Sequence, residues 1–246
     1  MKKVVIVGGG ISGLFSAYYL SKLNYQITII DNANFEHGCS HGNAGLIVPS
    51  HIVPLASPGV VPQAIKWMFN SNSPFSFHPK LNKDFISWCL RFLRNSTKAH
   101  VDNSILPLSN ISFLSSNLYK EIAEEFNNSF HLNSKGLLML FKSKRVAEEE
   151  TKLAQLANQH GIETKTLSPE ELKKLDPNCN YDALGGIHYL SDSHLTPNIL
   201  IKTLVEDLES KNVEFISNET ISEINVKEQQ IISVSSTRKK FEGDSF

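Results

Sequence analysis

The chain has 246 residues, of which 41% are hydrophobic and 20% charged, as expected for a globular protein of one large or two ordinary domains. Its net charge of −1 excludes a general electrostatic attraction to nucleic acid. The three cysteines, Cys39, Cys89 and Cys179, are odd in number and widely spaced. They therefore indicate reduced thiols of a cytoplasmic protein and neither a disulfide framework nor a metal site.

The N-terminal residues 1–31 contain the clearest pattern of the chain. Apolar runs predict buried parallel strands over 4–7 and 26–30, with a helix over 11–23 between them. Asp31 follows the second strand, where its carboxylate can accept hydrogen bonds from a ribose diol. Its charge would repel a 2′-phosphate, which disfavours NADP.

The turn between the first strand and the helix is rich in glycine. Gly8 permits a tight turn, Gly10 lets the backbone approach a pyrophosphate, and Gly13 lets the helix lie close to the sheet. The helix begins near Ile11 and Ser12, whose N–H groups favour phosphates. Because strand, glycines, helix, strand and acid follow in order, the pattern indicates dinucleotide binding.

A long stretch without periodicity follows, from Asn32 to Pro79, broken only by a short apolar helix near Gln63 to Phe69. A loop of this length in a compact domain is either functional or disordered, and its aliphatic residues argue against disorder. The small residues of 38–45 would let the backbone pass close to a flat cofactor. Ser40 and Asn43 could donate hydrogen bonds to its pyrophosphate or ring.

The middle of the chain is predicted to be mainly helical. Polar residues from Asp84 to Lys98, spaced three and four apart, form a narrow stripe on an otherwise apolar helix. Ser168 and Glu171 form a capping box, and Gly161 ends a helix. Further helices are expected at 104–126, 144–160, 169–176 and 197–210, and strands at 136–141, 186–190, 213–216, 220–226 and 231–235, the last two as a hairpin.

This order of elements predicts an α/β fold. A Rossmann-type nucleotide-binding domain, residues 1–80 and 195–246, is interrupted by a mixed α+β domain over residues 81–194.

Several segments in chain order resemble one family of flavoproteins. Besides the first βαβ unit, these are Ser40-x-x-Asn43-Ala44-Gly45, the run Pro58–Phe69, Gly185-Gly186-Ile187-His188-Tyr189 and Val213-Glu214-Phe215. Together they resemble the small subunits of FAD-dependent D-amino-acid dehydrogenases, in the family of D-amino-acid oxidases and glycine oxidases. The likeness extends over the whole chain.

The resemblance implies that FAD is the cofactor and that residues 81–194 form a substrate or cap domain. The residues implied to contact FAD are Gly8, Gly10, Ile11, Ser12, Gly13, Asp31, Ser40, Asn43, Ala44, Gly45 and Ile221. By the same likeness, hydride passes from the Cα of a D-amino acid to the flavin, and the imino acid hydrolyses to a 2-oxo acid and ammonia. A membrane quinone or the respiratory chain is the implied electron acceptor.

The last residues, Phe241–Phe246, resemble the entry to a further strand of the FAD sheet. The resemblance therefore implies the N-terminal portion of a longer enzyme, with both domains incomplete and this portion alone inactive. The Arg and Tyr that bind the substrate carboxylate in relatives are expected beyond Phe246, and no arginine of this chain is assigned that role.

The catalytic residue is unknown from the sequence, and His51 is a weak candidate because a hydrogen-bonded loop histidine is the commoner outcome. The register of His41 argues against covalent flavin attachment, and no metal site is expected. The helix at 84–98 is either a membrane-surface helix or a helix packed between domains. The protein is expected to be cytoplasmic. If this helix lies on a membrane surface, the protein is expected to be peripheral at the inner face of the membrane.

Three rival functions stay open at this point. The same fold serves D-proline or D-hydroxyproline, glycine or sarcosine dehydrogenases, and it would also serve a non-catalytic flavin-binding subunit. A simple NAD-binding module is disfavoured by the loop Ser40–Gly45 and by the long insertion.

Overall fold

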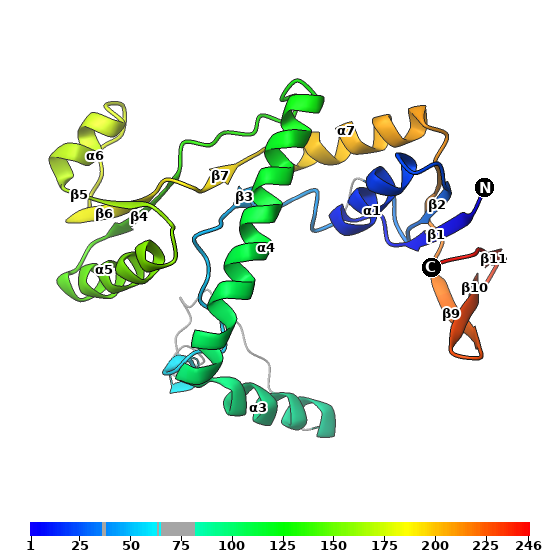
Figure 1. Ribbon diagram of the computed structural model, residues 1–246, viewed down its shortest axis with the longest axis horizontal. Helices are drawn as coiled ribbons and strands as arrows, with labels where there is room; N and C mark the ends of the chain where they lie inside the picture. Colours follow the sequence, from blue (N-terminus) through cyan, green and yellow to red (C-terminus); the bar gives the residue numbers. More distant parts are fainter. Residues whose placement is uncertain (36–37, 63, 65–81) are drawn as a thin grey trace. The chain divides into compact units, whose positions relative to one another are not determined.

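The computed structural model describes residues 1–35, 38–62, 64 and 82–246, and its internal contacts divide the chain into two units. Unit 1 consists of Met1–Leu46, Lys120–Asn133 and His194–Phe246, and unit 2 of Ile47–Tyr119 and Ser134–Ser193. Figure 1 labels the elements of both units. The short helix expected from Gln63 to Phe69 lies, except for Ala64, outside the described residues.

A parallel three-stranded sheet forms the centre of unit 1 (Figure 1). It consists of β1 (Lys3–Val7), β2 (Gln26–Ile30) and β8 (Glu214–Ile216), in the order β1-β2-β8. α1 (Ile11–Ser21) connects β1 to β2, and α7 (Pro197–Ser210) precedes β8. Val7 lies opposite Ile30, so the loops after β1 and β2 start at one edge of the sheet. The predicted Rossmann-type βαβ unit is confirmed.

The apolar periodicity of α1 and α7 explains how they pack. α1 buries Leu14, Ala17 and Tyr18, and α7 buries Leu200, Ile201, Leu204 and Leu208. These stripes contact each other, and α1 also lies against β1 and β2. Burying one large aliphatic side chain stabilises the fold by about 1.5–3 kcal/mol, so this layer holds the sheet and the turn above it in place.

A second, antiparallel sheet completes unit 1. Its order is β11-β10-β9, with β9 (Ile221–Lys227), β10 (Gln230–Ser236) and β11 (Lys240–Glu242). The predicted hairpin is confirmed, and β11 is an additional strand that the sequence analysis missed. Val234 and Phe241 pack against Val5 and Ile30 of the parallel sheet. Farther along the chain, Ser245 pairs with Val4 in parallel, which agrees with the implied entry to a further strand.

Helix α4 (Lys98–Glu125) contains Pro107, and its residues from Lys120 onward belong to unit 1. There the Tyr18 hydroxyl donates to Glu125 Oε2 at 2.6 Å, and Lys22 Nζ lies 2.8 Å from the same oxygen. Burial raises the pKa of Tyr18 to about 12, with the hydrogen bond to Glu125 as the second cause. This cluster fixes the end of α4 against α1.

The predicted helices at 84–98 and 104–126 have different bounds in the structure. α3 covers Lys83–Asn95, and α4 begins at Lys98. Ser96 leaves the helical region with ψ 59°, and the Thr97 hydroxyl accepts from His100 N at 3.2 Å. The break therefore lies at a capping threonine, and α4 begins six residues before the start predicted at residue 104.

Unit 2 is built around an antiparallel sheet of β4 (Leu137–Phe141), β6 (Gly185–Tyr189) and β5 (Thr164–Leu167), in the order β4-β6-β5. α5 (Lys144–Gln159) and α6 (Pro169–Leu175) lie on opposite sides of it (Figure 1). Ile187 packs with Ala154 and Ala157 of α5, whereas Gly186 faces Leu172 of α6. β5 is another strand without a sequence prediction, whereas the Ser168–Glu171 capping box is present.

The chain returns to unit 1 at His194, next to the predicted boundary at 195, but it enters unit 2 at Ile47 and not after residue 80. Ile52 packs with Val101 and Ile105, so the chain from Ile47 onward belongs to unit 2. The segment Lys120–Asn133 belongs to unit 1 because of the contacts of Tyr18. The short strands β3 (Leu46–Ile47) and β7 (Ser193–His194) lie where the chain passes from one unit to the other.

Candidate functional site

The glycine-rich turn joins β1 to α1 in unit 1. Gly8 has φ +111°, a region that favours glycine, and its N–H donates to the Ile30 carbonyl at 2.8 Å. A Cβ on Gly13 would collide with the Gly8 carbonyl. The helix can therefore approach the turn only because position 13 has no side chain, as the motif predicts.

The first turn of α1 presents N–H groups that have no partner within the helix. Gly10, at the N-cap position, has no side chain that could accept from them. The Ile11 N–H donates to Ser40 Oγ at 3.0 Å, and a Cβ on Gly10 would lie 3.3 Å from the same oxygen. The loop after β2 thus reaches the helix N-terminus, and Ser12 N–H remains beside it for an anion.

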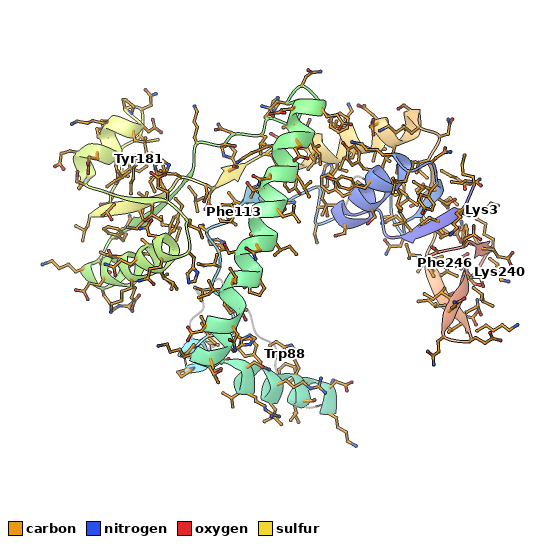
Figure 2. All side chains as sticks on the ribbon, in the orientation of Figure 1. Lys3, Trp88, Phe113, Tyr181, Lys240 and Phe246 are labelled. Atoms are coloured by element: carbon orange, nitrogen blue, oxygen red, sulfur yellow. The ribbon has the colours of Figure 1, made fainter. Side chains whose placement is uncertain are left out.

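A groove of about 700 Å³ runs beside this turn. It is lined by backbone and small side chains of the turn and α1, by Ser40, by apolar side chains of β1, and by Phe246. Phe246 is labelled beside β1 in Figure 2. A groove of this size, with a helix N-terminus at its wall, has the properties of a pyrophosphate cradle.

Asp31 follows β2 and braces the turn. Its Oδ2 accepts from Gly9 N–H at 2.6 Å, and its Oδ1 accepts from Ala33 N–H at 2.9 Å. A carboxylate can accept about four hydrogen bonds, so lone pairs remain for a ribose diol. The Asp31 backbone also binds β8 and the next loop, because its N–H donates to Ile216 and its carbonyl accepts from Glu219 N–H, both at 2.9 Å.

Gly9 is a functional residue that the sequence analysis missed. A Cβ at this position would collide with the Phe35 ring and lie 3.3 Å from Asp31 Oδ2. The motif requires glycine only at the first and third positions of the turn. The run of three glycines from Gly8 to Gly10 is the signal that could have found it.

Ile221 begins β9, two residues after Glu219. Its half-buried side chain packs against the cluster of Val5, Ile30, Val234 and Phe241. The structure therefore places Ile221 near the end of β2, in the same unit as Asp31. Glu219 is itself buried, with its Oε2 3.9 Å from the guanidinium of Arg238.

The loop Ser40–Gly45 is held mainly by its own side chains. Asn43 Nδ2 donates to the carbonyls of Cys39 and Ser40 at 3.1 and 2.9 Å, and its Oδ1 accepts from Gly45 N–H at 2.7 Å. Gly45 has φ +65°, and a Cβ there would collide with the Leu195 carbonyl. The amide expected to bind a ligand thus shapes the loop, while the neighbouring Ala44 is exposed.

His51 lies in unit 2, beside a buried carboxylate. The Ser50 hydroxyl and N–H donate to Asp192 at 2.5 and 3.1 Å, and Asp192 is fully buried. Burial raises the pKa of Asp192, against the hydrogen bonds from Ser50 and the charge of His51. His188, near Asp192 in sequence, donates from Nε2 to the Lys135 carbonyl at 2.8 Å. These contacts explain the fold of the loop, and they leave His51 a candidate from the sequence only.

Comparison with known families gives one match over nearly the whole chain. Residues 3–244 match the model of a family described as FAD dependent oxidoreductase.

Two curated relatives share the name D-amino acid dehydrogenase. A D-amino acid dehydrogenase of Helicobacter pylori strain J99 is 28% identical over 244 residues, which cover 99% of this chain and 58% of the relative. A D-amino acid dehydrogenase of Neisseria meningitidis is 28% identical over 247 residues, covering 99% of this chain and 59% of the relative. The chain thus spans little more than half the length of these relatives.

Solved structures share the fold at low identity. Glycine oxidase from Geobacillus kaustophilus has a TM-score of 0.70 at 17% identity, covering 99% of this chain and 54% of that protein. Glycine oxidase from Bacillus cereus has a TM-score of 0.68 at 13% identity, covering 98% and 53%.

Proposed function

Because this chain belongs to the family of FAD-dependent oxidoreductases, we propose that it is the FAD-binding part of a dehydrogenase that oxidises D-amino acids. The observation that carries this proposal is the match to relatives named D-amino acid dehydrogenase over 99% of the chain. The reaction would convert the Cα–N bond to an imine, which hydrolyses to a 2-oxo acid and ammonia. FAD, when bound, supplies the hydride acceptor for this oxidation.

The turn and the helix N-terminus would hold the pyrophosphate of FAD. Gly8, Gly10 and Gly13 keep Cβ atoms out of the cradle, while the N–H group of Ser12 supplies a donor and the N-terminus of α1 supplies the positive end of the helix dipole. The Ile11 N–H is already satisfied by Ser40 Oγ, so the hydroxyl proton of Ser40 is free to turn toward a phosphate oxygen.

Asp31 would accept the ribose hydroxyls through the lone pairs that Gly9 and Ala33 leave open. The backbone of Ile221 would contact the adenine. Asn43, Ala44 and Gly45 would follow the cofactor toward its flavin ring, with Asn43 as the residue that keeps the loop in shape.

The relatives contain a further portion that the chain does not match, and we assign the carboxylate-binding residues to that portion. His51 stays a candidate for contact with substrate. We expect the 246 residues alone to retain FAD weakly and to oxidise no D-alanine.

The electron acceptor and the location of the protein in the cell are also proposed. We infer that electrons pass to a quinone or to the respiratory chain and that the protein is cytoplasmic, in peripheral contact with the inner face of the membrane. The support is helix α3, which is amphipathic and has no buried residue.

Flavin absorbance tests the proposal directly. A version extended to the full length of the relatives should be yellow, and anaerobic D-alanine should bleach it while L-alanine does not. If only glycine, sarcosine or D-proline bleaches the flavin, that amine replaces D-alanine as the proposed substrate. The assignments of fold and cofactor would stay as they are. A colourless protein that takes up no added FAD would contradict the cofactor assignment, and bound flavin that no amine reduces would indicate a binding subunit.

A further inference from the structure

Helix α3 has a broad apolar surface, although none of its residues is buried. It begins at a well-formed cap, where Asn82 Oδ1 accepts from Phe85 N–H at 2.8 Å. The aromatic rings of Phe85, Trp88 and Phe92 stack along one side, with centroids 6.3 and 5.3 Å apart. Trp88 is labelled on this helix in Figure 2.

Four large apolar side chains of α3 are exposed to solvent. The exposed fraction is 49% for Ile86, 53% for Trp88, 63% for Leu90 and 55% for Leu93. Ile86, Leu90 and Leu93 are four and three residues apart, so they form one continuous stripe on the helix. A contiguous apolar surface of this kind marks an interaction site.

Cations flank this stripe. Lys83, Arg91 and Arg94 line a shallow groove of about 380 Å³ together with Ile86, Ser87 and Leu90. Within the described residues, none of these three cations forms an ion pair, and Asp84 is the only acid of the helix. The surface therefore combines exposed apolar groups with unneutralised positive charge.

We propose that α3 binds in the plane of an anionic lipid bilayer, with Trp88, Leu90 and Leu93 among the acyl chains and Arg91 and Arg94 at the phosphates. An amphipathic helix with aromatic and aliphatic residues on one face and cations beside them is suited to that interface. Within the described chain, no helix has the length and apolarity needed to cross a membrane. A membrane surface is the partner that fits best, because exposed apolar side chains and cations without ion pairs lie side by side on this helix.

This inference rests on the peripheral contact within the proposed function and names its surface. Flotation of the 246-residue chain with vesicles tests it, using equimolar phosphatidylglycerol and phosphatidylcholine against phosphatidylcholine alone. We expect binding to the anionic vesicles that falls with added salt. The double variant Arg91→Glu, Arg94→Glu should bind at least about 25-fold more weakly, because each basic residue contributes about fivefold.

Two further variants distinguish the contribution of the cations to vesicle binding from that of the apolar side chains. Leu90→Ser with Leu93→Ser should weaken binding even at low salt, because the acyl chains lose their apolar contacts. Lys152→Glu with Lys165→Glu makes the same change in net charge at exposed positions of unit 2 and should leave binding within twofold. Circular dichroism checks that each variant is folded.

Flotation needs neither bound flavin nor turnover, so it can fail or succeed independently of D-alanine oxidation. Equal binding to neutral vesicles, or undiminished binding by the Arg91 and Arg94 variant, would overturn the inference. So would a dimer in solution that the Leu90 and Leu93 variant dissociates, because the stripe would then cover a second copy of the chain.

Discussion

The glycine turn Gly8–Gly13 and the loop Ser40–Gly45 belong to the same unit but are shaped by different forces. In the turn, absent side chains leave room for backbone to approach backbone, as the Gly8 carbonyl does at Gly13. In the loop, one side chain, Asn43, makes the hydrogen bonds that define the conformation. The first is therefore sensitive to added atoms and the second to removed polar groups.

Gly13→Ala should have the largest effect. The new methyl group meets a backbone carbonyl that cannot rotate away, so we expect a loss of about 2–3 kcal/mol in the free energy of unfolding and loss of FAD binding. Urea unfolding and FAD titration measure both. Gly38→Ala is the matched control, because among the residues that the structure describes its methyl group would meet only Ser40 N, at 3.9 Å. An unchanged Gly13→Ala protein would mean that the turn is not close-packed.

Asn43→Ala should cost about 1–2 kcal/mol, because two exposed hydrogen bonds and a part-buried one are lost. FAD affinity should fall about tenfold as the loop loosens. Asn43→Asp keeps the acceptor for Gly45 N–H and loses the two donations, so its loss of stability should be intermediate. Should both variants keep their stability while FAD affinity drops, Asn43 contacts the ligand directly and the comparison fails.

Ser40→Ala removes the acceptor for Ile11 N–H and should cost about 1 kcal/mol, as does the loss of other helix caps. Ser40→Thr keeps the hydroxyl and serves as the control. The two variants should differ in urea midpoint and, by less than Asn43→Ala, in FAD affinity. If Ser40→Ala weakens FAD binding more than Asn43→Ala does, the hydroxyl acts on the phosphate more than on the helix.

The two regions also show what a sequence can predict. Gly13 acts on Gly8, five residues away in the chain, so the spacing of the motif was sufficient, and the family match confirms FAD as the cofactor. The pairing of Asp31 with Gly9, and that of Ser40 with Ile11, depends on how separate segments meet in space. The spacing of residues in a motif cannot predict such contacts between separate segments.

The same reason explains why the sequence did not predict that the segment Lys120–Asn133 belongs to unit 1. This segment lies in the middle of a helical stretch, and its sequence resembles that of its neighbours. Contacts with distant segments assign it to unit 1, among them those of Glu125 with Tyr18 and Lys22. β5 and β11 were missed because three- and four-residue strands give too few alternations to detect.

Glu125→Gln should have the smallest effect and tests that long-range contact. The hydrogen bonds from Lys22 and then Tyr18 hold the pKa of Glu125 below its ordinary value of 4.5. The folded protein thus binds this proton less readily than the unfolded chain, and the carboxylate stabilises the fold at pH values above 4.5. Because its side chain is 44% exposed, we expect only about 0.5 kcal/mol at pH 7.

The sign of that pH dependence separates a charged contact from simple packing. The stability difference between the wild type and Glu125→Gln should be constant near neutral pH and should shrink as the pH falls below 4.5, because the wild-type carboxylate then takes up its proton. Urea unfolding at a series of pH values measures it, with Glu124→Gln as the control on the same helix. A difference that persists at low pH would show that glutamine disturbs the packing of α4 on Tyr18. Side-chain packing would then hold the segment Lys120–Asn133, as close packing holds the glycine turn. The charge of the Glu125 carboxylate would not contribute to its stability.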